Sequence, residues 1–188
     1  MINEKRTVIV RDVELHWAKL NKAVDSFGDM KWEVQCRVHD KDIADKLKKD
    51  MFLNIKSDED DNGDKYWRFN VQRKLYKAGQ DALPEHEREK NGPPEVVNGD
   101  REPITASIGN GSKGNLKLFQ APYDYKGKKG VSTVLTAVQI TDLKVYEQNS
   151  ISFKWIKGHN NHLQNEICDK LAFNASKNKP LLVDVGYE

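Results

Sequence analysis

The sequence has few cysteines. Only Cys36 and Cys168 occur among 188 residues, and they do not form a Cys-x-x-Cys pair. A disulfide-rich scaffold or a structural zinc site requires more ligands at closer spacing. The scarcity argues against both classes, and we expect Cys36 and Cys168 to be reduced, buried thiols.

Long apolar runs are also missing. No stretch approaches the roughly 20 apolar residues that a membrane-spanning helix needs, and residues 1–12 lack the apolar run of a secretory signal. Charged residues make up 32% of the chain, and the mean hydropathy is −0.79. We therefore expect a cytoplasmic protein with no membrane partner.

An excess of charge of one sign is missing too. The formal net charge at pH 7 is +2, which is too small to attract a polyanion by itself. A nucleic-acid site would therefore have to arise from local clustering of basic side chains. We expect no cofactor.

Alternating apolar and polar residues are abundant. The pattern of residues 30–38 predicts a half-buried antiparallel strand. In residues 39–50, Ile43, Ala44 and Leu47 recur at helical spacing between aspartates at the start and lysines at the end, which predicts a short helix.

A hairpin is predicted after this helix. Residues 51–55 and 65–76 read as strands on either side of a turn that contains an Asn-Gly pair. The second strand is expected to turn three side chains toward the core, namely Trp67, Phe69 and Val71. The acidic residues 58–61 are expected to point away from any nucleic acid.

An irregular segment follows the predicted hairpin. Residues 78–100 are polar and broken by prolines, which predicts a loop. The β-branched run from Val131 to Tyr146 is long enough to wrap a barrel, and glycines punctuate its approach. We therefore expect a mainly β fold, a five-stranded Greek-key barrel of the oligonucleotide-binding (OB) type with a short helix, over residues 1–147.

Residues 148–188 are expected to form a strand and a helix appended to this barrel. An appendage of this size cannot bury its apolar stripe alone. It would dock on the barrel or pair with a second copy of the chain, so self-association is an alternative.

Two segments combine basic side chains with aromatic rings, the combination that holds phosphates and unstacked bases. The first is the outward face of strand 65–76, with Tyr66, Arg68, Lys74 and Tyr76. The second contains Lys113, Lys117, Phe119, Tyr123, Tyr125, Lys126, Lys128 and Lys129. Each stacked aromatic contributes ~1–3 kcal/mol per base, with little sequence preference. Solubilising lysines and rim tyrosines are the alternative explanation.

Residues 5–147 resemble the single-stranded DNA-binding proteins of tailed bacteriophages. The resemblance rests on the glycine-rich IGNGS entry at residue 108, the following hairpin, and the AVQI segment that ends at Ile140 with Leu143 after it. It implies an OB barrel that coats single strands in phage replication, recombination or repair, in the host cytoplasm and without catalysis. Replication proteins such as a polymerase or a helicase are the protein partners it implies.

Residues 153–172 resemble the last strand, histidine loop and final helix of type 1 ribonuclease H. The resemblance puts His159 at that family's catalytic histidine and Asp169 at its last metal-binding carboxylate. Two-metal hydrolysis there uses four carboxylates, and the other three have no matching context in this chain. His159 and His162 lack the thiolate neighbours of a zinc pair. We expect a non-catalytic fragment acquired by gene fusion and no bound metal.

The sequence thus predicts a sequence-independent single-stranded DNA-binding protein that is not an enzyme. Two alternatives are an RNA–DNA hybrid nuclease of the ribonuclease H type and a protein-interaction module that recruits replication enzymes.

Overall fold

The computed structural model describes residues 2–26, 28–145, 167, 170–171 and 173–174. The chain divides into two compact units, residues 1–147 and 148–188. The predictions for His159, His162 and Asp169 lie outside the described residues. In the second unit, Ile167 and Leu171 lie on helical turns and are exposed.

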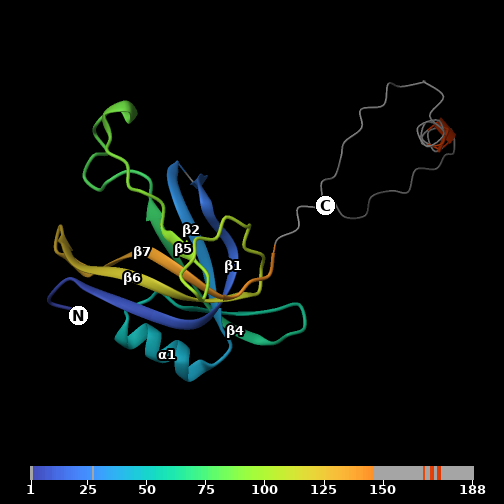
Figure 1. The fold of residues 1–188 in the computed structure, drawn as a ribbon, viewed down its shortest axis with the longest axis horizontal. Coiled ribbons are helices and arrows are strands. Elements are labelled where there is room, and N and C mark those ends of the chain that lie inside the picture. The colour runs from blue at the N-terminus through green and yellow to red at the C-terminus, as the bar shows by residue number, and fades with distance from the viewer. Residues whose placement is uncertain (1, 27, 146–166, 168–169, 172, 175–188) are drawn as a thin grey trace, which may run out of the picture. The chain divides into compact units, whose positions relative to one another are not determined.

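The first unit is built on one seven-stranded sheet with the order β3-β4-β2-β1-β6-β7-β5. Every neighbouring pair is antiparallel except β5 and β7, which are parallel. The strands are β1 (Arg6–Ser26), β2 (Asp29–Val38), β3 (Lys56–Glu59), β4 (Lys65–Lys74), β5 (Glu95–Val97), β6 (Ser112–Tyr125) and β7 (Lys128–Asp142). In the described part of the first unit, a single α-helix, α1 (Lys41–Asp50), and a 3₁₀ turn at Glu85–Glu87 accompany the sheet (Figure 1).

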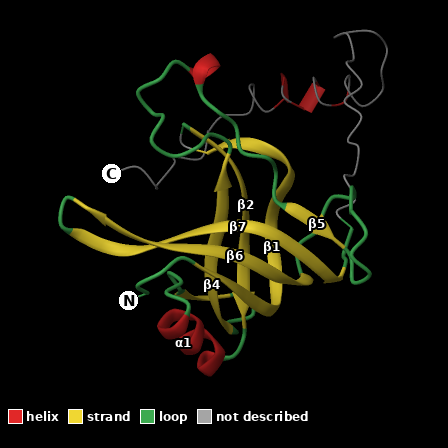
Figure 2. Ribbon diagram, turned by 60° about the vertical axis from the view of Figure 1, so that its left-hand side comes forward, coloured by secondary structure: helices red, strands yellow, loops and turns green. Residues whose placement is uncertain are grey.

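The long strand β1 connects the two halves of the sheet. Its first half pairs with β6 and its second half with β2, and the register shifts between Val10 and Val13 and again after His16. The sheet curls so that β4 comes close to β7, although no ladder joins these two strands among the described residues. The β6–β7 hairpin extends beyond the other strands (Figure 2).

The core fills the inside of the curled sheet. Alternate residues of β1, β2, β4, β6 and β7 point inward, and the most completely buried apolar side chains are Leu15, Leu116, Leu118, Leu135, Val10, Val13, Val34 and Val138. Helix α1 adds Ala44 and Leu47 to this core. The outward side chains of the same strands face away from this core.

Helix α1 forms where the sequence predicts it. Asp40 is the N-cap, since its side chain accepts hydrogen bonds from the backbone N–H groups of Asp42 at 2.7 Å and Ile43 at 3.1 Å. Lys48 and Lys49 occupy the last turn, where their positive charge interacts favourably with the negative end of the helix dipole. None of the helices in the described part of the chain is long and apolar enough to cross a membrane.

The mainly β fold with one short helix is confirmed, but the sheet has seven strands where five were predicted. The two additional strands are short. The exposed strand β3 lies in the acidic segment, and β5, which buries Val97, lies in the segment predicted as a loop. Residues 51–55 are not a strand. Met51 and Leu53 both donate backbone hydrogen bonds to the Leu47 carbonyl, so this segment closes the helix.

The cysteine prediction is confirmed for Cys36. Its thiol is free and fully buried in the core, and burial raises its pKa. Cys168 lies outside the described residues.

Candidate nucleic-acid interface

Strand β4 presents its predicted faces. Phe69 and Val71 are buried and Trp67 is half-buried against the core, while Arg68 and Lys74 lie on the outward side. This alternation follows from the two-residue period of a strand.

Tyr66 is the exception, and the prediction of an open stacking ring there is wrong. Only 7% of Tyr66 is exposed. The Arg37 guanidinium lies 4.2 Å from the centre of the Tyr66 ring, and the centre of the His39 ring lies 6.4 Å from it. The alternation along β4 places Tyr66 on the outward face. Arg37 comes from the neighbouring strand β2 and covers the ring there, which the pattern of β4 alone does not predict.

Arg68 is engaged by an acid. Its Nε donates to Asp58 Oδ2 at 2.9 Å, and this hydrogen bond lowers the pKa of Asp58. Asp58 lies on β3 directly beside β4, so one residue of the acidic segment contacts a predicted binding residue. The expected orientation of the acidic turn relative to nucleic acid stays a prediction.

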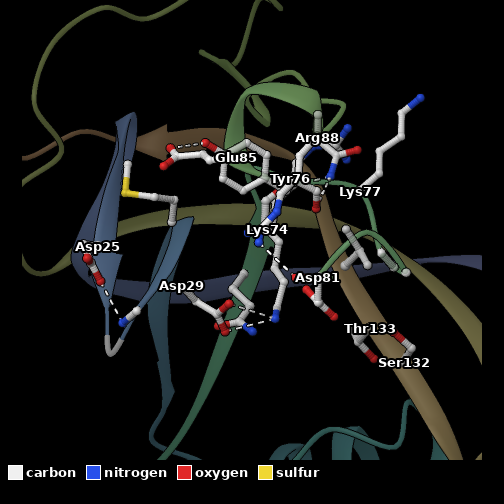
Figure 3. Close-up of a pocket in the computed structure, with 18 residues that line it drawn as sticks. Asp25, Asp29, Lys74, Tyr76, Lys77, Asp81, Glu85, Arg88, Ser132 and Thr133 are labelled. Atoms are coloured by element: carbon white, nitrogen blue, oxygen red, sulfur yellow. Dashed lines mark hydrogen bonds and ion pairs between the residues drawn. The ribbon is translucent and has the colours of Figure 1, made fainter. Parts of the chain in front are cut away.

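Lys74 and Tyr76 line a cavity of about 700 Å³ between the β1–β2 turn, the end of β4, the following loop and β7 (Figure 3). Lys74 forms an ion pair with Asp29 at 2.9 Å. The Tyr76 hydroxyl donates to Glu85 at 2.6 Å, and this bond raises the pKa of Tyr76. Both predicted residues are thus held by acidic neighbours.

The β6–β7 hairpin carries the second predicted group, which is open to solvent. The exposed fractions are 37% for Phe119, 48% for Tyr123 and 66% for Tyr125. The lysines of this group are exposed as well, namely Lys113, Lys117, Lys126, Lys128 and Lys129.

Two of these lysines are held locally. Lys126 Nζ lies 5.3 Å from the centre of the Tyr125 ring, and Lys129 pairs with Asp124 at 3.7 Å. The hairpin therefore presents three rings and five ammonium groups with one acid among them.

The strand register joins the two groups. Arg68 is opposite Arg37, Arg37 is opposite Glu14, and Glu14 is opposite Lys113, so one outward row crosses β4, β2, β1 and β6. Glu14 is the acid in the middle of this row. The strands on either side of it supply cations, Arg37 from β2 and Lys113 from β6.

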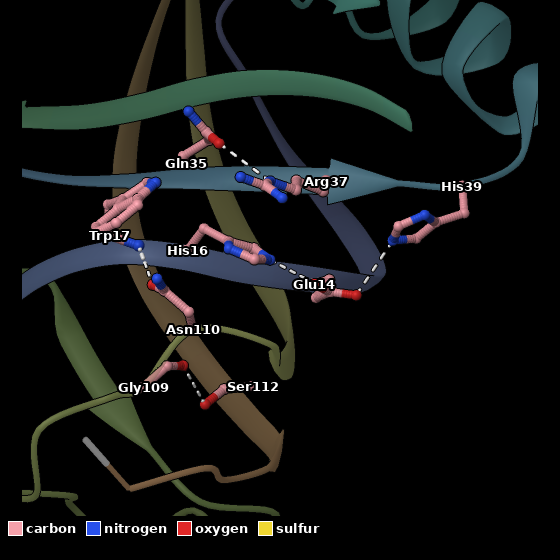
Figure 4. Close-up of polar contacts among 9 residues, drawn as sticks. All are labelled: Glu14, His16, Trp17, Gln35, Arg37, His39, Gly109, Asn110 and Ser112. Atoms are coloured by element: carbon pink, nitrogen blue, oxygen red, sulfur yellow. Dashed lines mark hydrogen bonds and ion pairs between the residues drawn. The ribbon is translucent and has the colours of Figure 1, made fainter. Parts of the chain in front are cut away.

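Glu14 is held by two histidines (Figure 4). His16 Nε2 hydrogen-bonds to one of its oxygens, and His39 Nε2 lies 3.1 Å from the other. Burial opposes the charge on Glu14, but the histidines outweigh it and hold the pKa of this carboxyl below its ordinary value.

Two further basic residues, Arg11 of β1 and Arg101 of the loop after β5, lie near the predicted Lys117 of β6, and the sequence patterns singled out neither of them. Arg11, Arg101 and Lys117 border a cleft of about 400 Å³ together with Ile9. Within residues 2–145, no ion pair is recorded for these three cations. They come from three separate segments, so no local pattern could have grouped them.

A bound metal ion requires a set of ligand side chains. In the described part of the chain, no group of three or more His, Cys, Asp or Glu side chains could hold a metal ion. The histidine and aspartate suggested by the ribonuclease H resemblance lie outside that part.

Comparison with known proteins identifies two relationships. Residues 122–177 match the RNase H family model, and this match begins inside β6 and includes β7. Ribonuclease H of Shewanella denitrificans is 38% identical over 76 residues, which are 38% of this chain and 48% of that protein. The chain spans about half the length of the curated relatives it matches.

The other relationship is structural. The single-stranded DNA-binding protein from bacteriophage Enc34, in a C-terminal truncation, aligns with a TM-score of 0.50 and 16% identity over 77% of this chain and 92% of that chain. The same phage protein in complex with single-stranded DNA gives a TM-score of 0.48 and 16% identity over 74% and 89%. The chain therefore has a fold similar to that of a bacteriophage single-stranded DNA-binding protein and carries a segment that matches the RNase H family.

Proposed function

We propose that this protein binds single-stranded DNA without sequence preference and without catalysis, through an OB-type barrel formed by residues 1–147. The observation that carries the proposal is the β6–β7 hairpin, on which the exposed rings of Phe119, Tyr123 and Tyr125 alternate with lysines. Its fold, similar to that of a phage protein named for this activity, supports the proposal.

The chemistry of the hairpin suits a single strand better than a duplex. Every base has a π-face that can stack on an aromatic ring, but only when it is separated from its partner strand. Lysine is a flexible point charge that follows phosphates without reading bases. Affinity for any sequence is therefore expected, with strong dependence on salt.

The biological setting belongs to the same proposal. The chain would act in phage DNA replication, recombination or repair in the host cytoplasm, with a polymerase or helicase as protein partner. Residues 148–188 would be a non-catalytic appendage that came from a ribonuclease H by gene fusion.

A titration of fluorescent oligo-dT against a duplex of equal length tests the proposal. We expect tighter binding of the single strand and affinity that falls as salt rises from 50 to 200 mM. Tyr123→Ala and Tyr125→Ala should each weaken binding about 5-fold or more, since a stacked ring contributes ~1–3 kcal/mol. Ile43→Ala, which removes an exposed apolar side chain from α1, is the matched control. Equal affinity for duplex and single strand would contradict the proposal.

A second candidate function follows from the RNase H match at residues 122–177. A hybrid nuclease predicts magnesium-dependent cleavage of an RNA–DNA duplex that Asp169→Asn abolishes. Our proposal predicts that neither the wild type nor Asp169→Asn cleaves this duplex.

A protein-interaction module, the other alternative, predicts no retention of oligonucleotide at moderate salt.

A further inference from the structure

Trp17 is a large aromatic side chain that the described fold leaves outside the core. Its exposed fraction is 62%, whereas Trp32 on the neighbouring strand is buried. Trp17 lies on β1 at the place where the pairing with β2 shifts register, between His16 and Lys19. Exposure of an indole on the central strand of a sheet leaves apolar surface in water.

The backbone at Trp17 is strained. Its φ is 51°, in the left-handed region that non-glycine residues rarely occupy and that bulky residues occupy least. Such strain persists only where surrounding structure holds it, and it concentrates at functional sites. Asn110 provides the hold, because its Oδ1 accepts the Trp17 backbone N–H at 2.8 Å.

Asn110 is itself fixed to β1. It belongs to the Gly-Asn-Gly turn before β6, in which the Gly111 N–H donates to the Leu15 carbonyl at 2.9 Å and the Ser112 hydroxyl donates to the Gly109 carbonyl at 2.8 Å. The turn thereby holds the bulge in a shape that turns the indole outward (Figure 4).

A second bulge on β1 serves as an internal comparison. Asp12 has a φ of 50°, and its N–H is accepted by Asn115 Oδ1 at 3.0 Å. The same device thus occurs twice on one strand, and a bend in β1 needs no tryptophan at that position. What the bulge at Trp17 adds is the exposed ring.

Polar groups that suit a nucleotide lie on β2, the strand that pairs with this part of β1. His16 is opposite Gln35 in the β1–β2 register, and Arg37 on the same outward side donates through Nε to Gln35 at 3.2 Å. A sheet face that carries an exposed indole, an amide and a guanidinium is one on which an unpaired base can stack while its phosphate meets the cation.

We propose that Trp17 is a base-stacking platform on the outward face of β1 and β2, separate from the β6–β7 hairpin, and that Asn110 is the residue that positions it. This inference rests on the proposed function, because it names a further contact of the same single strand. Arg37 meets the phosphate of the stacked nucleotide.

The test uses the full chain, oligo-dT, three variants and one control variant. Trp17→Ala should weaken binding about 5- to 150-fold, and Trp17→Phe should retain most of the affinity because a smaller ring still stacks. Asn110→Ala should give an intermediate loss, since the ring remains but its bulge is released. Ile43→Ala again controls for loss of exposed apolar surface.

Tryptophan emission supplies a measurement that a merely structural role would not move. The chain holds four tryptophans, and the difference between wild type and Trp17→Phe isolates the signal of Trp17. That signal should be accessible to iodide in the free protein and shielded after oligo-dT binds. This measurement uses only the wild type and Trp17→Phe, so it decides the matter even where Trp17→Ala unfolds.

The outcomes separate the two proposals. If the hairpin variants lose affinity while Trp17→Ala binds like the control and the Trp17 signal stays accessible, the stacking platform is wrong and the proposed function stands. If the wild type does not prefer the single strand, the proposed function itself is wrong.

Discussion

His16 lies at the crossing point of several charged groups on the outward face of β1. It contacts Glu14 on its own strand and faces Arg37 and His39 from β2 and the residue that follows it. Burial is the largest influence and lowers the pKa of His16, and Arg37 lowers it further against the opposing effect of Glu14. His16 is therefore harder to protonate in the folded protein than in the unfolded chain.

This shift makes stability depend on pH in a specific direction. The folded pKa of His16 is below its ordinary value of 6.5, so as pH falls through 6.5 the unfolded chain takes up a proton before the folded one does. The contribution of His16 to the free energy of unfolding is therefore complete above pH 6.5 and is lost as the pH falls below it. His16→Gln should flatten the fall in melting temperature between pH 7.5 and 5.5, and His86→Gln, at an exposed position, should leave it unchanged. The effect of Glu14 belongs to a separate window, below 4.5.

Gly130 lies beneath the ring of Tyr123, its partner across the β6–β7 hairpin. A Cβ at this position would lie 2.5 Å from the Tyr123 hydroxyl oxygen and 2.6 Å from the ring carbon that bears it. Gly130→Ala should therefore displace the ring and lower oligo-dT affinity about as much as Tyr123→Ala does, ~1–3 kcal/mol. The melting temperature should hardly change, because the ring is half exposed. Gly92→Ala, which meets open space, is the control; unchanged affinity in Gly130→Ala would remove Tyr123 from the interface.

At the scale of elements, β6 packs against the backbone of β7 at one point without room for a side chain. Gly114 sits where the β6–β7 register shifts, and a Cβ there would lie 2.6 Å from the Gln139 carbonyl oxygen and 3.4 Å from Leu15. The contact is with backbone, which cannot rotate away. Gly114→Ala should lower the free energy of unfolding in urea by about 1–3 kcal/mol, as overpacking does. Gly92→Ala should lower it far less, and equal effects would mean that β7 yields easily.

The sequence predicted elements well where one period governs them. Alternation in residues 30–38 and 65–74 placed Phe69 and Val71 inside and Arg68 outside, as observed. Strand β1 gave no such signal, because the bulges at Asp12 and Trp17 interrupt its alternation twice. The three residues of β5 are too few for a periodic pattern, and their pairing with β7 depends on a distant segment.

The candidate site could be predicted only in part for a related reason. The hairpin residues Phe119, Tyr123 and Tyr125 are local in sequence, and the structure exposes all three. The covering of Tyr66 by Arg37 and the exposure of Trp17 arise from contacts between separate strands. Such contacts carry no signature within either strand alone.

At the scale of the whole molecule, the net charge of +2 conceals an uneven distribution. The hairpin from residue 113 to 129 holds five lysines and one aspartate, while the turn between β3 and β4 is acidic. Separate regions of opposite charge orient a polyanion toward the basic region. Binding strength should therefore depend on the first unit and little on residues 148–188.

A chain that ends at Glu147, where the first unit ends, tests this division. It should bind oligo-dT with the same affinity and the same slope of log affinity against log salt as the full chain, since that slope counts the phosphates neutralised. A shallower slope in the shortened chain would mean that lysines after residue 147 also contact the strand. The nuclease alternative is tested with three proteins: the full chain, the chain that ends at Glu147 and full-length Asp169→Asn. Each is incubated with an RNA–DNA hybrid and magnesium, and we expect no hydrolysis by any of them. Hydrolysis by the full chain but by neither of the other two would make the appended segment part of a working nuclease and overturn the non-catalytic proposal.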